Sequence, residues 1–213
     1  MTPSRRSLRA LFLAAALALV SSLAPAGDEP AAAYFVMQHH ETLLRTLRLP
    51  VSPGRDGKLD EAMGTLIDFD DLVARAFGEP CPQGASKCTN HWAELAPKQR
   101  DEVRDLLRKL VRKQYKKNLE KTTSYKLTMQ GTKPMGGSIR VRTEAASTTD
   151  AREAPVRIDY FVVDTKGLRV VDVALEGSSL TKNYYEQFHK MFLNKDQGYP
   201  HIVKKLREKL QND

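Results

Sequence analysis

Apolar residues recur at intervals of three or four positions in five parts of the chain, which is the spacing of helices that bury one face. The longest of these segments begins at Pro97, a residue suited to a first helical turn. One face of this segment is apolar, and lysine and arginine fill the other. Its apolar positions are Val103, Leu106, Leu107, Leu110, Val111, Tyr115 and Leu119. The same spacing predicts further helices over residues 34–49, 59–77, 181–193 and 199–210.

Between the long helix and the last two helices, apolar and polar residues alternate, which is the pattern of half-buried antiparallel strands. The alternating positions are Leu127 and Met129, Ile139 and Val141, then Val156, Ile158, Tyr160 and Val162, and finally Val171, Val173 and Leu175. Gly136-Gly137 and Lys166-Gly167 predict tight connections. Helices, then a meander of about four strands, then helices again predict a single α+β domain.

The N-terminus has the three parts of an export signal. Arg5, Arg6 and Arg9 form a positive region, residues 10–20 are apolar, and residues 24–26 are small. A membrane anchor is the alternative, but this apolar run is shorter than the roughly 18 to 20 residues that a spanning helix needs. We therefore expect a signal peptide over residues 1–26 that is cleaved, a mature domain over residues 27–213, and a periplasmic location.

The export route stays open, because the paired arginines within residues 4–8 resemble a twin-arginine signal but also occur in Sec signals. Cleavage would remove three arginines and no acidic residue, so the formal net charge would fall from +8 to +5. The remaining basic residues are scattered among Asp and Glu, which is typical of a solvated surface. Nucleic acid is therefore not an expected partner.

Cys81 and Cys88 are the only cysteines in the sequence, and they flank a short segment that contains proline and glycine. In an oxidising compartment this arrangement predicts a disulfide. The alternative is a zinc site that uses both cysteines and His91. Structural zinc needs four ligands, and the sequence offers no fourth ligand nearby.

No nucleophile elbow, phosphate loop or metal-binding helix motif occurs in the sequence. His39 and His40 are adjacent on a predicted helix and point about 100° apart, so they form a poor joint site. Asp68, Asp70 and Asp71 resemble an acid/base or metal cluster, but helix capping explains acidic residues at a helix start more simply. We therefore expect no catalytic residue and no metal.

Two stretches carry a resemblance to a known family. The first contains Ile67-Asp68-Phe69-Asp70 and Ala76-Phe77-Gly78, followed by His91-Trp92 and by residues 95–100. The second is residues 170–180, VVDVALEGSSL, followed by Asn183-Tyr184 and Gln187-Phe188. In this combination the mature chain resembles the MlaC family of periplasmic phospholipid-carrying proteins, also called toluene-tolerance or organic-solvent-tolerance proteins. It departs from the family in the inserted cysteine loop and in Ser178, where the family usually has valine.

The resemblance implies a twisted antiparallel sheet packed against helices, with phospholipid tails in an apolar cavity between them and the headgroup near solvent. It also implies a monomer with no cofactor, which exchanges lipid with an outer-membrane lipoprotein complex and an inner-membrane ABC transporter complex. Such exchange would maintain the lipid asymmetry of the outer membrane. Because no arginine cluster is visible along the sequence, we expect headgroup identity to matter little.

Apolar residues of the helices and strands are expected to line the cavity, although the same residues also suit an ordinary core. The expected lipid-binding residues are Phe69, Leu72, Phe77, Val103, Leu106, Leu107, Leu110, Val141, Ile158, Tyr160, Val162, Val171, Val173 and Leu175. Two alternatives stay open. One is a small enzyme, which would need two buried titratable groups within hydrogen-bond reach, and the other is an interaction protein with a filled core.

Overall fold

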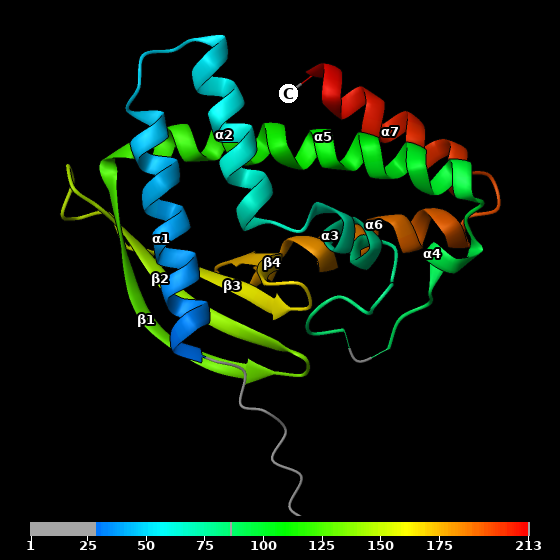
Figure 1. The fold of residues 1–213 in the computed structure, drawn as a ribbon. Helices are drawn as coiled ribbons and strands as arrows, with labels where there is room; N and C mark the ends of the chain where they lie inside the picture. The colour runs from blue at the N-terminus through cyan, green and yellow to red at the C-terminus, as the bar shows by residue number, and fades with distance from the viewer. Residues whose placement is uncertain (1–28, 86, 213) are drawn as a thin grey trace, which may run out of the picture.

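The computed structural model describes residues 29–85 and 87–212, without the side chains of residues 120–122. The predicted leader, residues 1–26, lies outside the described residues. Helices flank a central meander of strands in chain order (Figure 1). The helices are α1 (Glu29–Leu47), α2 (Pro53–Leu66), α3 (Phe69–Ala76), α4 (His91–Glu94), α5 (Pro97–Lys121), η1 (Thr122–Ser124), α6 (Leu180–Leu193) and α7 (Gly198–Asn212). The strands are β1 (Tyr125–Met135), β2 (Ser138–Ser147), β3 (Val156–Asp164), β4 (Leu168–Leu175) and β5 (Ser178–Ser179). The predicted α+β class is confirmed.

The strands form one antiparallel sheet in the order β1-β2-β3-β4-β5. The four long strands match the four predicted strands, and β5 adds a two-residue edge beside β4. Gly136 and Gly137, at φ values of +47° and +88°, form the turn between β1 and β2. Gly167, at +99°, lies in the turn between β3 and β4. Both predicted tight connections are therefore present, and each uses glycine where φ is positive.

The helices cover one face of the curved sheet (Figure 1). Helix α1 lies across β1 and β2, and Thr132 of β1 donates a hydrogen bond to Glu29 at the first turn of α1 (2.6 Å). Helix α5 runs across the upper half of the molecule in Figure 1 with α7 beside it, while α3 packs on α6. Within the described chain, every helix is too short or too polar to span a bilayer.

The helix predicted over residues 59–77 is wrong as a single helix, because the chain breaks between α2 and α3. Ile67 is extended (φ −108°, ψ 128°) and forms an isolated parallel bridge with Val170 of β4. The backbone N–H of Asp68 donates to the Val170 carbonyl (2.9 Å). Ile67 and Asp68 thus pair with the sheet, although helical periodicity alone assigns them to a helix.

Asp68 also begins the next helix. Its carboxylate accepts hydrogen bonds from the backbone N–H groups of Asp70 (3.1 Å) and Asp71 (3.0 Å), as an N-cap does. The capping interpretation of this acidic group is therefore confirmed. The described residues contain no group of three or more His, Cys, Asp or Glu side chains placed to hold a metal ion.

Candidate functional site

The candidate site is the apolar interior between the helices and the inner face of the sheet. Twelve of the fourteen expected lining residues belong to this one cluster. Nine are buried: Phe69, Leu72, Phe77, Val103, Leu107, Leu110, Val141, Tyr160 and Val162. Three are partly buried against it: Leu106, Ile158 and Val173. The structure thus brings together residues of α3, the α3 C-terminus, α5, β2, β3 and β4.

Two of the expected residues lie elsewhere. Val171 belongs to a separate buried cluster with Phe161, Val163 and Ala174, so the prediction that it faces the helices is wrong. The cause is an irregularity in the pairing of β3 with β4, where Val162 pairs with Val170 and Phe161 pairs with Asp172. Val171 is the extra residue, and it reverses the alternation along β4.

Leu175 is also not part of the interior. It pairs with Ile158 at the end of β4, but its side chain is 47% exposed. The alternation therefore gives its strand correctly but not its burial, because Leu175 lies where the sheet ends.

Helix α5 meets the sheet through a pair of tyrosines. Tyr160 of β3 lies in a row across the sheet between Val141 of β2 and Val173 of β4. Tyr115 of α5 lies close enough to Tyr160 for the two phenol groups to influence each other's pKa. Burial raises the pKa of Tyr160 to about 12 and that of Tyr115 well above its ordinary value. Both hydroxyls therefore stay protonated at neutral pH.

The interior is tightly packed. Val103, Leu107 and Leu110 on α5 and Val141 on β2 have no solvent-accessible surface. No water-sized space adjoins these side chains, so they contact protein atoms on every side. A bound acyl chain would have to take the place of contacts within this core.

Outside this interior lie two open pockets, both lined largely by polar groups. One of about 270 Å³ contains three arginines, Arg108 and Arg112 of α5 and Arg169 of β4. Sequence reasoning missed this grouping because Arg169 is far from the other two in the chain. The other, of about 400 Å³, lies between the cysteine loop and the turn from β1 to β2.

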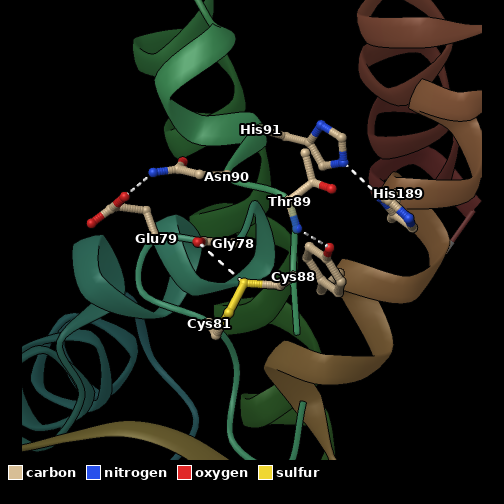
Figure 2. The surroundings of a disulfide bond; sticks show 9 residues. Gly78, Glu79, Cys81, Cys88, Thr89, Asn90, His91 and His189 are labelled. Atoms are coloured by element: carbon tan, nitrogen blue, oxygen red, sulfur yellow. Dashed lines mark hydrogen bonds between the residues drawn. A yellow bond between two sulfur atoms is a disulfide. The ribbon is translucent and has the colours of Figure 1, made fainter. Parts of the chain in front are cut away.

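The cysteine loop, residues 77–90, joins α3 to α4 (Figure 2). Cys81 and Cys88 form a disulfide with Cα atoms 5.8 Å apart, as predicted, so neither is available to bind zinc. Gly78 precedes the disulfide at φ +91°, and a Cβ there would lie 2.3 Å from the Thr89 carbonyl oxygen. The Thr89 N–H donates to the Tyr185 hydroxyl of α6 (2.8 Å). The loop is therefore fastened to α6.

A pair of histidines lies beside this loop (Figure 2). Nε2 of His91 is 2.7 Å from Nδ1 of His189, and Nδ1 of His91 is 3.2 Å from a Glu94 carboxylate oxygen. The Phe192 ring stacks on His91 at 4.3 Å. Both ring nitrogens of His91 thus have partners, and His91 is only 3% exposed. The arrangement is that of a packing cluster that joins α4 to α6.

Comparison with known proteins gives this fold a family. The description of the MlaC protein family matches residues 52–208, about three quarters of the chain. The chain belongs to the MlaC family. The match covers α2 to most of α7 and includes every strand of the sheet. The resemblance inferred from the sequence motifs is confirmed.

A solved structure agrees with this MlaC assignment at the level of the fold. It is a phospholipid-binding protein from Ralstonia solanacearum in complex with a phospholipid. The alignment has a TM-score of 0.67 and 19% sequence identity, and it covers 84% of this chain and 97% of the other. No curated protein sequence matches this chain significantly. The two proteins thus share a fold although few residues are identical.

Proposed function

We propose that this chain is a periplasmic phospholipid carrier. It would shuttle lipid between an inner-membrane ABC transporter complex and an outer-membrane lipoprotein complex and so maintain the lipid asymmetry of the outer membrane. The observation that carries the proposal is the MlaC family match over residues 52–208. The phospholipid in the similarly folded Ralstonia protein supports lipid as the ligand, and the predicted leader supports export.

The acyl chains would lie between α5 and the inner face of β2, β3 and β4. Burial of apolar chain is worth about 0.8 kcal/mol per CH₂, so one long acyl chain gains on the order of 10 kcal/mol on leaving water. Entry would separate apolar side chains of this core from one another. They would then contact lipid instead, so the lost apolar contacts are largely replaced.

Binding and release are sufficient chemistry for this role. Tyr115 and Tyr160 are titratable groups of the interior that influence each other's pKa, but their raised pKa values leave neither able to act as a base at neutral pH. His91 and His189 are absent from the lining of the arginine pocket and of the pocket beside the cysteine loop. We therefore propose a carrier and not an enzyme.

The test is to fill the proposed site without unfolding the protein. Val173 is partly buried on the inner face, so Val173→Trp adds bulk where the acyl chains would lie. Overpacking of this kind costs about 1–3 kcal/mol. Val51→Trp is the control, because Val51 is 80% exposed.

Both variants are exported to the periplasm and purified, and their bound phospholipid is quantified by mass spectrometry beside their melting temperatures. We expect Val173→Trp to melt no more than about 10 °C below the parent and to lose most of its lipid. Val51→Trp should keep its lipid. Equal lipid content in folded Val173→Trp and Val51→Trp would contradict this location. A parent protein that never binds lipid would favour the interaction protein with a filled core.

A further inference from the structure

A pocket on the outside of the core gathers positive charge. It lies where the end of α2, the start of α3, the middle of α5 and the start of β4 meet. Its lining residues are Gly64, Ile67, Asp68, Phe69, Asp70, Arg108, Arg112 and Arg169. At about 270 Å³ it is near the lower end of the range for ligand pockets, which suits a small polar group better than an acyl chain.

The two carboxylates of the pocket already have partners. Asp68 caps α3 through the backbone N–H groups of Asp70 and Asp71. Asp70 pairs with Arg108 and also lies 3.6 Å from Arg104. The acidic residues therefore leave the charge of Arg112 and Arg169 without compensation.

Arg112 and Arg169 have no carboxylate within 4.0 Å in the described part of the chain. The Arg112 guanidinium lies over the Phe69 ring, 4.7 Å from its centroid, and its Nε is buried without a hydrogen-bond partner. Arg169 is half-buried and donates to the Leu168 carbonyl oxygen (2.7 Å). The pKa of His39 is lowered mainly by the burial of His39 and further by the positive charge of Arg169.

Gly64 of α2 lies beside Arg112. A Cβ at this position would lie 3.6 Å from Nη2 of Arg112, which is an ordinary van der Waals contact. Glycine inside a helix costs about 1 kcal/mol relative to alanine. The position therefore accepts a larger side chain, and such a side chain would extend beside Arg112.

We propose that Arg108, Arg112 and Arg169 form a binding site for a phosphate group. Guanidinium groups match phosphate oxygens with paired hydrogen bonds, and two uncompensated positive charges suit a phosphate that carries one or two negative charges. The pocket borders the candidate lipid site, because Phe69 belongs both to its lining and to the main core. The phosphate could be that of a phospholipid headgroup, a source that rests on the proposed function, or a free phosphate.

The first experiment uses inorganic phosphate. Sodium phosphate is titrated into ¹⁵N-labelled protein at constant ionic strength, and amide shifts are followed for the parent, Arg112→Gln/Arg169→Gln and Arg152→Gln. Arg112 and Arg169 have no carboxylate partner, so their removal leaves no acid unpaired. Arg152, with a side chain 95% exposed, controls for diffuse charge. We expect amide shifts centred on the pocket. The Kd for phosphate should be at least about tenfold larger in the double variant than in Arg152→Gln.

The second experiment measures uptake of phosphatidylglycerol from vesicles by native mass spectrometry with the same proteins. Weaker phosphate binding together with lower lipid uptake in the double variant assigns the site to the headgroup. Weaker phosphate binding with unchanged uptake assigns it to free phosphate. The proposal is overturned if the double variant matches Arg152→Gln in both experiments. Parent protein that binds phosphate but takes up no lipid would refute the carrier function and leave the site standing.

A second pair of variants keeps the test decisive if the double variant does not fold. Gly64→Glu places a carboxylate beside Arg112, where it should compete with phosphate, and Gly64→Gln adds the same bulk without charge. We expect the glutamate variant to bind phosphate at least about tenfold more weakly than the glutamine variant. Equal binding by the two would count against a phosphate site at Arg112.

Discussion

Replacing Asp172 by alanine is expected to destabilise the protein strongly, because this carboxylate holds the junction between β4 and α6 together. Asp172 has no exposed surface. It accepts hydrogen bonds from the Ser179 hydroxyl (2.6 Å), the Thr181 N–H (3.0 Å) and the Val173 N–H (2.9 Å). Ser179 in turn caps α6 by accepting from the Lys182 N–H (3.0 Å). One side chain thus orders the start of α6.

The size of the effect follows from these bonds. Ser179 is 7% exposed and Thr181 is fully buried, so water cannot replace the lost acceptor. A buried donor without its partner costs about 1–3 kcal/mol, and part of this is offset because no carboxylate has to be buried. The Asp172→Ala variant should therefore lose about 3 kcal/mol of unfolding free energy. This corresponds to a melting temperature lower by about 6–12 °C.

Asp172→Asn separates the hydrogen bonds from the charge. Its amide oxygen can accept from the backbone N–H groups, and its NH₂ group can donate to the Ser179 hydroxyl. Burial raises the pKa of Asp172 above its ordinary value of 3.8, so folding favours the protonated acid. This contribution to stability is fully present below about pH 3.8 and is lost as the pH rises through the raised pKa. The asparagine variant should therefore gain stability relative to the parent as the pH rises from 3.8 to 7.

The assay is urea unfolding followed by circular dichroism, for the parent and both variants at several pH values between 4 and 7. The reasoning is refuted if Asp172→Ala lies within about 0.5 kcal/mol of the parent, the usual range for a surface substitution. It is also refuted if the unfolding free energy of the parent rises relative to that of Asp172→Asn as the pH rises.

Three further predictions concern the rest of the fold. Gly78→Ala should lower the unfolding free energy, measured in urea, by about 3 kcal/mol, because Gly78 has a positive φ and a Cβ there would meet the Thr89 carbonyl. The control Gly84→Ala should lower it by only about 1–2 kcal/mol, because Gly84 has a φ of +77° but nothing within 4 Å of its Cβ position. Replacing both Cys81 and Cys88 by serine should lower the unfolding free energy by about 2–3 kcal/mol and leave a folded protein; two free thiols in the intact mass of freshly exported parent would contradict the bond. Burial lowers the pKa of His40, whose Nδ1 has no hydrogen-bond partner. The parent should therefore lose stability relative to His40→Leu as the pH falls below about 6.5. Parallel curves of unfolding free energy against pH for the two proteins would refute this.

The helices and strands were largely predictable because each follows one period. The apolar stripe of α5 and the alternation along β2 and β3 both lead to the inner face that the structure shows. Periodicity failed at Ile67 and Val171, where contacts between α2, β3 and β4 decide the backbone path. The Ile67 bridge joins residues far apart in the chain, and the pairing irregularity between β3 and β4 leaves no mark on the alternation of apolar residues.

The candidate site was predictable only as a region. Sequence patterns identified the apolar residues that gather in the core, but not that Val103, Leu107, Leu110 and Val141 have no accessible surface. The arginine pocket was missed because only the fold brings Arg169 of β4 to the same pocket as Arg108 and Arg112 of α5. The link from Asp172 to Ser179 and Thr181 was hidden in the same way, although all three lie in the family motif.

The central claim, that this MlaC-family protein carries phospholipid, is tested most directly by native mass spectrometry of the unmodified protein purified from the periplasm. We expect a complex whose added mass equals one or more phospholipids, released as the free lipid when the gas-phase complex is activated. Lipid-free protein should regain the same mass increment after incubation with phospholipid vesicles. Protein that carries no lipid on purification and takes up none from vesicles would contradict the claim.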